Sequence, residues 1–259
     1  MSGEVLLARD GDIATATLSN PARLNALDLA MWERLGGIAR TLDADESVRC
    51  VVVRGAGEKA FAAGADIAAF ATERANSTQA KEYGRRIAAA MHSFAACRHP
   101  VVALIQGACV GGGLLVASQC DLRICNESAR FGVPVKNLGL VEAYDELRGM
   151  MNVVGRAAAL EILLEGRIWG AREAYEKRQV SRVVADDKVV VEAYASARRI
   201  AEGAPLAARW HKKFVRRLAE ARPLSEAEYD ESYACFDTAD FREGVAAFLA
   251  KRKPQFKGR

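Results

Sequence analysis

Two segments rich in small residues could present backbone N–H groups to a ligand. The first, residues 59–67 (KAFAAGADI), follows a strand-like run and leads into a helix-like stretch. Gly64 and the alanines around it allow the backbone to approach a ligand closely. Asp66 is of a residue type that caps helices, which would leave nearby N–H groups pointing outward. Because such loops are also common structural devices, this one alone does not identify a function.

The second segment, residues 106–115 (QGACVGGGLL), also follows a strand-like run. Its three consecutive glycines, Gly111, Gly112 and Gly113, stand where a helix should begin. Unpaired N–H groups at a helix N-terminus stabilise negative charge, including charge that develops during a reaction. The segment therefore predicts an anion-stabilising turn, with a purely structural turn as the alternative.

Together, and in this order, the two segments resemble those of the enoyl-CoA hydratase/isomerase, or crotonase, superfamily. The resemblance extends over nearly the whole chain. The matching motifs are NPARLNAL at 20–27, AGAD at 63–66, GGG at 111–113, Asp121, ARFG at 129–132, NLGL at 137–140 and FLAKRKPQF at 248–256.

This resemblance implies that the N–H groups of Ala65 and Gly112 form an oxyanion hole for the thioester oxygen of an acyl-CoA. Reaction at the α or β carbon pushes charge onto that oxygen, and fixed dipoles stabilise the charge without reorganising. The resemblance further implies contacts to coenzyme A, which enters only as part of the substrate. The residues concerned are Arg23, Leu24, Ala26, Ala62, Ala63, Ala65, Asp66 and Ile67, with Lys253 and Phe256 reaching the coenzyme of a neighbouring subunit.

The assembly that the family implies is a homotrimer or a dimer of trimers. The tail that carries Lys253 and Phe256 is also consistent with an exposed, partly frayed chain end. Its role in a neighbouring site therefore stays open at this point.

The chain departs from the family pattern at the two positions that matter most for water addition. Hydratases of the family use two glutamates as acid and base around the added water. Here Leu115 stands two residues after the three glycines, and Val135 follows Pro134. Leucine and valine cannot transfer protons, so the usual hydratase mechanism is not expected.

Carboxylates do occur in the loop where the family's isomerases and dehalogenases place one, after Leu-Gly-x-x. In residues 138–147 (LGLVEAYDEL) the candidates are Glu142, Asp145 and Glu146, with Tyr144 as a weaker one. A carboxylate near a polarised thioester can remove an α or γ proton, especially where partial burial raises its pKa. Acidic residues at the start of a helix also simply favour the helix dipole, so a structural role remains the alternative.

We therefore expect an enzyme that acts on an acyl-CoA or enoyl-CoA thioester through an oxyanion-stabilised enolate, isomerase-like or hydratase-like. Double-bond migration is favoured over water addition, and residues 70–83 are expected to shape the acyl pocket. The alternative is a catalytically silent acyl-CoA-binding or scaffolding protein of the same fold. A decarboxylase is less favoured, because Ala65 stands where that branch of the superfamily has a histidine.

Hydrophobic periodicity predicts the elements that must position these loops. Alternation over residues 4–19 around Asp-Gly-Asp predicts a hairpin, and apolar runs predict strands at 48–53, 101–105 and 122–125. A further apolar run covers 180–184. Helices are predicted at 27–44, 79–96, 113–118, 157–164, 171–176, 189–202, 206–221, 225–236 and 240–251.

Alternating strands and helices indicate an α/β fold. The resemblance makes this a crotonase-type spiral of repeated ββα units with a C-terminal helical oligomerisation region. The Gly-Ala-Pro sequence at 203–205 predicts a hinge. We accordingly expect a core at 1–203 that carries the CoA-binding and oxyanion-hole loops, and a trimerisation region at 204–259.

Composition limits the remaining classes of function. A net charge of +4 is too small to indicate a nucleic-acid partner and merely permits a polyanionic ligand such as coenzyme A. No apolar run is long enough to cross a bilayer, and the N-terminus lacks the order of a signal peptide, so we expect a cytoplasmic protein without a membrane partner. The six cysteines include no CxxC pair, which favours buried free thiols over disulfides or a metal site.

Overall fold

The computed structural model describes residues 2–259, so residue 1 of the predicted core lies outside the described part. The strands are β1 (Glu4–Asp10), β2 (Ile13–Ser19), β3 (Cys50–Gly55), β4 (Ala60–Ala62), β5 (Val101–Ile105), β6 (Ala108–Val110), β7 (Leu122–Asn126), β8 (Arg130–Gly132), β9 (Trp169–Gly170) and β10 (Arg182–Val184). Within residues 2–259 they form a six-stranded sheet, in the order β1-β2-β3-β5-β7-β10, and a four-stranded sheet, in the order β4-β6-β8-β9.

Helices occupy most of the remaining chain. The α-helices are α1 (Leu29–Ala44), α2 (Phe70–Glu73), α3 (Ser77–Ala96), α4 (Gly112–Gln119), α5 (Tyr144–Glu165), α6 (Ala171–Glu176), α7 (Val189–Ala201), α8 (Pro205–Leu218), α9 (Glu226–Glu231) and α10 (Ala239–Leu249). The 3-10 turns are η1 (Pro21–Arg23), η2 (Ile67–Ala69), η3 (Pro134–Leu138) and η4 (Ala234–Asp237).

The predicted ββα repeat is present. After the β1–β2 hairpin, β3, β5 and β7 each pair in parallel within the large sheet. Each is followed at once by a short strand of the small sheet, β4, β6 or β8, and these also pair in parallel. A helix then returns the chain to the next unit. Because every unit adds one strand to each sheet, the chain advances as a spiral.

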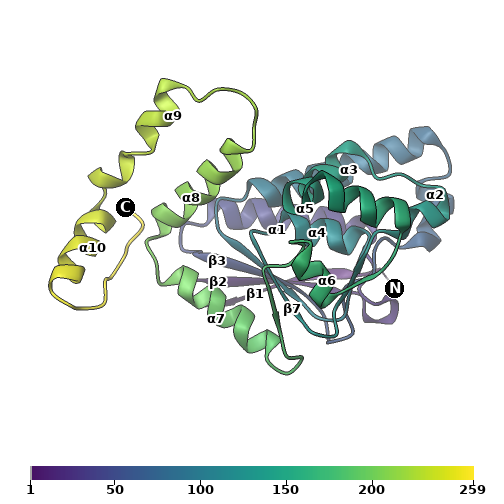
Figure 1. Ribbon diagram of the computed structural model, residues 1–259, viewed down its shortest axis with the longest axis horizontal. Helices are drawn as coiled ribbons and strands as arrows, with labels where there is room; N and C mark the ends of the chain where they lie inside the picture. The colour runs from purple at the N-terminus through teal and green to yellow at the C-terminus, as the bar shows by residue number, and fades with distance from the viewer. Residues whose placement is uncertain (1) are drawn as a thin grey trace.

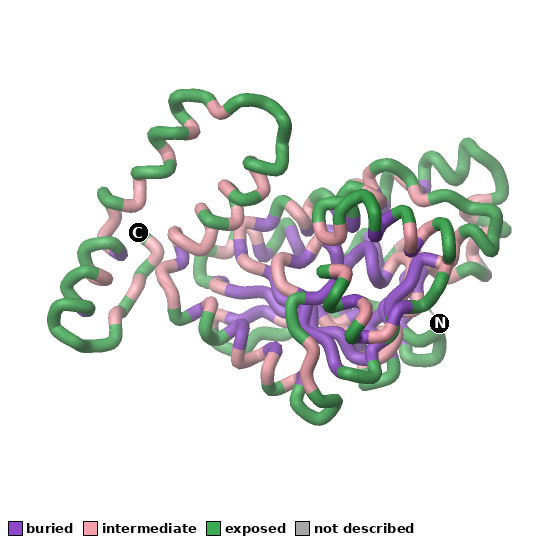
Figure 2. Tube along the Cα trace, in the orientation of Figure 1, coloured by how far each residue is buried: buried purple, intermediate pink, exposed green. Residues whose placement is uncertain are grey.

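Helices cover both faces of the large sheet (Figure 1). On one side lie α1, α3, α4 and α5, and on the other lies α7, which packs on β3, β5 and β7. Burial is concentrated in the strands between these layers (Figure 2). The largest fully buried side chains include Trp32, Phe61, Phe94, Phe131 and Trp169.

A glycine allows the start of α4, in the glycine-rich segment 106–115, to pack directly on β4. A Cβ at Gly113, the second residue of α4, would lie 2.2 Å from the carbonyl oxygen of Ala62 in β4. No side chain fits at that separation, so α4 packs backbone to backbone on β4. The start of α4 is thereby fixed beside the end of β4, from which the first loop leaves.

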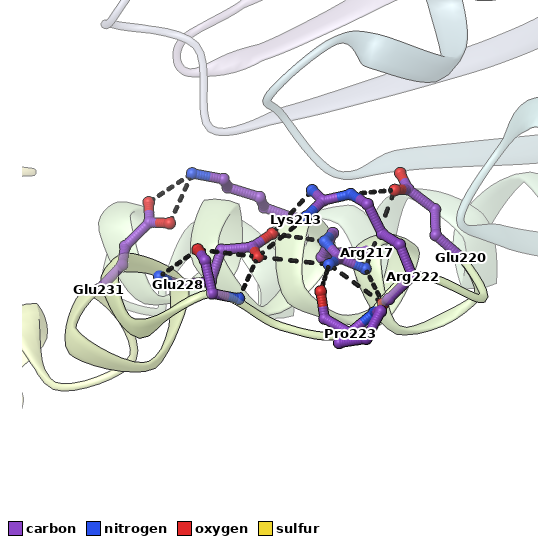
Figure 3. Close-up of polar contacts among 8 residues, drawn as sticks. Lys213, Arg217, Glu220, Arg222, Pro223, Glu228 and Glu231 are labelled. Atoms are coloured by element: carbon purple, nitrogen blue, oxygen red, sulfur yellow. Dashed lines mark hydrogen bonds and ion pairs between the residues drawn. The ribbon is translucent and has the colours of Figure 1, made fainter.

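Residues 204–259, here called the C-terminal arm, project from the core as α8, α9 and α10 (Figure 1). Salt bridges join α9 to α8: Lys213 contacts Glu231 at 2.5 Å, and Arg217 pairs with Glu228 (Figure 3). The end of the chain folds back on α10, where Asp240 accepts hydrogen bonds from the N–H groups of residues 257 and 258 at 2.7 and 2.9 Å. Of the two alternatives left open for the tail, the frayed end is not what the structure shows, because residues 257 and 258 are held on α10.

The arm leaves large apolar side chains uncovered in the single chain. Phe248 is 83% exposed and Leu249 76% exposed, both at the end of α10. Exposed apolar side chains grouped in this way are typical of protein–protein contacts. The expected homotrimer or dimer of trimers stays a prediction, which sedimentation equilibrium would measure.

An ionic contact fastens the arm to the core, and its loss should destabilise the protein. Asp121 accepts from the main-chain N–H of Val101 at 2.7 Å and pairs with Lys212 at 2.8 Å and Arg216 at 3.0 Å. The Lys212 side chain is only 6% exposed, so Asp121→Ala would leave a buried, unpaired ammonium group. We expect this substitution to lower the free energy of unfolding by roughly 2 to 3 kcal/mol, measured by urea denaturation.

A matched control is Asp187→Ala, which breaks the ion pair with Lys188 on the exposed surface. Surface pairs contribute little, so this variant should unfold almost as the wild type does. Equal losses in both variants would contradict a specific role for the Asp121 contact.

Some predicted elements differ from the structure. The small sheet was not predicted, because its strands are only two or three residues long and show no alternation. The helix predicted at 157–164 is the second half of the longer α5, whose two halves meet at a kink at Gly155. None of the helices in the described part combines the length and apolarity needed to span a membrane.

Candidate active site

The two predicted loops meet backbone to backbone. A Cβ at Gly64 would lie 4.0 Å from the nitrogen of Gly112, and one at Gly111 would lie 3.5 Å from the Cα of Gly64. Gly64 and Gly111 both have positive φ, +108° and +49°, a conformation that L side chains rarely adopt. Glycine is therefore favoured at both positions by conformation, while the contacts themselves are of ordinary van der Waals length.

Two N–H groups are left free where the loops meet. Gly112 is the first residue of α4, and an N–H at this position has no acceptor within its own helix. Leu27 bonds to the residues on either side of Ala65, donating to the carbonyl of Gly64 at 2.8 Å and accepting from the N–H of Asp66 at 3.0 Å. Within residues 2–259 the N–H groups of Ala65 and Gly112 donate no hydrogen bond.

These two residues line a cavity of about 610 Å³. Most of its wall is apolar, and the residues predicted to shape the acyl pocket contribute Phe70, Ala80 and Lys81 among others. The charged side chains of the described lining are Arg74, Lys81, Glu142 and Glu146. An apolar cleft with a few converging polar groups is the usual form of a small-molecule site.

The segments predicted to contact coenzyme A are brought together beside this cavity. Asn25 is 1% exposed and donates to the carbonyl oxygens of Ala56 and Ala60 at 3.0 and 2.8 Å, which anchors the turn at 20–27. The carbonyl of Leu24 accepts from the N–H of Ala63 at 3.0 Å. Arg23 and Asp66 form an ion pair across the two segments. The segments 23–26 and 62–67 are thus bonded to each other, although Ala62 itself is fully buried, and their contact with coenzyme A stays a prediction.

The other two predicted contacts lie elsewhere in the single chain. Lys253 pairs with Glu202 at 3.0 Å, and Phe256 packs in the C-terminal arm near Trp210 and Gly244. Neither belongs to the described lining of the cavity. Their predicted contact with a neighbouring subunit's coenzyme A stays a prediction.

The positions that carry the acid and base in hydratases form part of the apolar wall. Leu115 is 2% exposed and lines the cavity from α4. Val135 lines it from η3 and packs against the hydrophobic core. Neither side chain can transfer a proton to the bound ligand.

A carboxyl pair faces the same cavity. Glu142 precedes α5, and Glu146 lies four residues later in its first turn, where it is 9% exposed. The Glu146 carboxylate accepts from the main-chain N–H of Ala143 at 2.6 Å, which closes the helix N-terminus. Burial, followed by the negative charge of Glu146 and a hydrogen bond to it, raises the pKa of Glu142 to about 8. Glu142 can therefore hold a proton near neutral pH.

Asp145, the third predicted carboxylate, is not brought to this cavity. It lies 3.4 Å from His92 of α3 and 4.0 Å from Arg148. Tyr144 is 91% exposed and also absent from the described lining. His99 is buried, with Nε2 2.9 Å from the carbonyl of Leu42, and burial lowers its pKa to about 4.

The cysteines are free thiols, as predicted, and all except Cys235 are buried. Burial raises the pKa of Cys120 to about 12 and that of Cys109 well above its ordinary value, so neither is a ready nucleophile. In the described part of the chain no three His, Cys, Asp or Glu residues are grouped so that they could hold a metal ion.

Sequence reasoning did not single out Arg74 and Trp32, which both line the cavity. Arg74 stands in a segment of mixed polar residues whose contacts depend on how α2 and α3 pack. Trp32 belongs to the apolar face of α1, where core residues are expected, and it is 1% exposed. No sequence signal distinguishes its indole ring from the rest of that face.

Comparison with known proteins agrees with this geometry. The family model described as enoyl-CoA hydratase/isomerase matches residues 8–259. A probable enoyl-CoA hydratase of Rhizobium meliloti is 36% identical over 262 residues, covering 100% of both chains. A short-chain-enoyl-CoA hydratase of Clostridium acetobutylicum is 30% identical over 98% of both chains.

Among solved structures, an enoyl-CoA hydratase/carnithine racemase from Magnetospirillum magneticum superposes with a TM-score of 0.97. It is 53% identical and is matched over 98% of this chain and 96% of its own. The match includes both glycine loops and the C-terminal arm, because it extends over nearly the whole length of each protein. The chain therefore belongs to the enoyl-CoA hydratase/isomerase family of enzymes, the crotonase superfamily.

Proposed function

We propose that this enzyme converts an acyl-CoA thioester through an enolate and moves a proton between carbon atoms of the acyl chain. The single observation that carries the proposal is the meeting of three groups in one cavity: the free N–H groups of Ala65 and Gly112, and the carboxyl group of Glu142. The N–H groups would hold the thioester oxygen. The Glu142 carboxyl group would exchange protons with the carbon atoms next to the thioester.

The proposed step is a proton transfer from carbon to Glu142 that leaves an enolate. The Glu142 carboxylate takes a proton from the α carbon, and the electron pair of the broken C–H bond moves onto the thioester oxygen as an enolate. The two N–H dipoles stabilise that charge. In a β,γ-unsaturated thioester, transfer of a proton from the Glu142 carboxyl group to the γ carbon then shifts the double bond, and exchange of that carboxyl proton with solvent lets deuterium enter. A base with a pKa near the working pH suits this exchange, because it both accepts and releases the proton.

Water addition is supported less well. The relatives named above are enoyl-CoA hydratases by name, yet Leu115 and Val135 occupy the two positions that carry glutamates in the hydratase mechanism. The only carboxyl groups in the described lining, Glu142 and Glu146, come from one short segment. A proton shuttle on one side of the ligand fits this arrangement better than an acid and a base on two sides.

The test is to incubate the protein with a panel of enoyl-CoA and acyl-CoA thioesters in deuterated water and to follow their masses. We expect deuterium to enter at carbon without a gain in mass equal to water. Hydration would contradict the proposed shuttle. Binding without either change would favour the alternative, a silent acyl-CoA-binding protein.

A further inference from the structure

Arg74 is a cation in the cavity wall without an anionic partner. It lies between α2 and α3 and lines the cavity, as does Lys81. No described carboxylate forms an ion pair with Arg74, including that of Glu73 next to it in the chain. Its Nε atom is buried and has no hydrogen-bond partner. Leaving a guanidinium unpaired in a largely apolar cleft costs free energy.

Two aromatic rings hold this guanidinium in place. Its central carbon lies 3.7 Å from the ring centre of Tyr83 and 4.5 Å from that of Phe70. Tyr83 is 5% exposed and belongs to the buried face of α3. Stacking against rings fixes the plane of a guanidinium and leaves its in-plane N–H groups available. A fork of this kind matches the two oxygens of a carboxylate.

The carboxyl pair across the cavity does not supply the missing anion. Glu142 pairs with Glu146, and their shared surroundings keep a proton on Glu142 up to a pH of about 8. Near neutral pH Glu142 is therefore largely protonated, and the described lining also holds the two cations Arg74 and Lys81. The cavity is left with an excess of positive charge on the side formed by α2 and α3.

We infer that Arg74 determines substrate specificity and pairs with a second carboxylate at the far end of the acyl chain. The preferred substrates are then CoA thioesters of dicarboxylic acids. This inference rests on the proposed function, because it places the thioester at Ala65 and Gly112 and the acyl chain along the remaining wall. The carboxylate of the ligand completes the contacts that the protein leaves open at Arg74.

The test compares affinities by calorimetry, with succinyl-, glutaryl- and adipyl-CoA as carboxylate-ended probes. Each is paired with the methyl-ended acyl-CoA of the same carbon number, and free coenzyme A is measured alongside. At the chain length that reaches Arg74, we expect the carboxylate-ended probe to bind roughly 10- to 100-fold more tightly than its methyl-ended partner, as for a charged hydrogen-bonded pair. In Arg74→Met that ratio should fall close to one, and Arg74→Lys should retain part of it.

A matched control is Arg85→Met. Arg85 lies on the exposed surface of α3, pairs with Glu82 and is not among the described lining residues. Its loss should leave the ratio as in the wild type. Two results would overturn the inference in a protein that still binds coenzyme A. One is an affinity ratio near one in the wild type at every chain length, and the other is a ratio that is unchanged in Arg74→Met.

Three further outcomes separate a failure of this inference from a failure of the proposed function. If Arg74→Met weakens the binding of free coenzyme A as much as that of every thioester, Arg74 binds a phosphate of the coenzyme and the inference is wrong. If neither coenzyme A nor any thioester binds the wild type, both the proposed function and the inference are wrong. If the preference is present but no deuterium exchange occurs, only the proposed reaction is wrong.

Discussion

Replacement of Gly112 by proline should lower kcat roughly 100- to 1000-fold, the usual effect of losing one oxyanion donor. Proline removes the N–H group and nothing else that the helix needs. Residue 112 is the first of α4, where proline is well tolerated because an N–H there has no helical acceptor. Gly111 before it has φ +49° and ψ −121°, outside the helical region that a following proline disfavours.

The matched control for this substitution is Gly112→Ala. Both new residues carry a Cβ, which at this position would lie 3.2 Å from Cζ2 of Trp32, tight enough that the indole must shift slightly. Alanine retains the N–H group, so the alanine variant reports the effect of the added Cβ alone. The informative quantity is the ratio of the two kcat values in the deuterium-exchange assay. A proline variant within a few-fold of the alanine variant would exclude Gly112 as an oxyanion donor.

The glycine loops could be located from the sequence for a physical reason. A backbone site needs positive φ and close approach between chains, and both demands are met by glycine alone. Gly64 and Gly111 meet the first demand and Gly113 the second, so the glycine content of the loops indicates the geometry of the site. The β1–β2 hairpin was predictable for a similar reason, since alternation and its Asp-Gly turn are encoded locally.

The small sheet could not be found in this way. β4, β6 and β8 are three residues each and are stabilised by pairing with strands that lie far away in the chain. Three residues are too few for a periodic pattern to be read. The segment of β6 also overlaps the glycine-rich turn, whose composition suggests a loop.

The choice among the acidic residues likewise depended on the structure. Glu142, Asp145 and Glu146 lie within five residues, and which of them face the ligand is decided by where α5 begins and how it is rotated. Glu142 precedes α5 and lines the cavity together with Glu146 of the first turn, whereas Asp145 lies beside His92. Arg74 depends on tertiary packing even more, since Phe70 and Tyr83 approach it from two helices.

The carboxyl pair also explains how one side chain can serve as both base and acid. A carboxylate with the ordinary pKa of a glutamate is a weak base and would take a proton from carbon slowly. Burial and the neighbouring charge of Glu146 raise the pKa of Glu142 to about 8, which makes its carboxylate a stronger base. We assign Glu146 as a positioning residue, because it raises the pKa of Glu142 and caps the helix N-terminus beside it.

Glu142→Gln should reduce the rate of deuterium exchange roughly 100- to 10,000-fold, because glutamine keeps the size of the side chain and cannot exchange a proton with carbon. The affinity for the thioester should change little. Asp145→Asn is the matched control from the same helix, and it should exchange deuterium at the wild-type rate because Asp145 lies outside the described lining. If instead Asp145→Asn is inactive and Glu142→Gln is active, the base is Asp145.

The pH profile tests the same assignment from a second direction. Below its pKa of about 8, Glu142 is protonated and cannot accept the α proton, so kcat/KM should rise as the pH increases and level off above about 8. Glu146→Gln removes the neighbouring charge and retains an oxygen that can accept from the N–H of Ala143. The pKa of Glu142 should then fall, and the rising limb should move to lower pH. A purely structural role for Glu146 would lower activity at every pH without moving the limb, and would leave burial alone as the cause of the raised pKa.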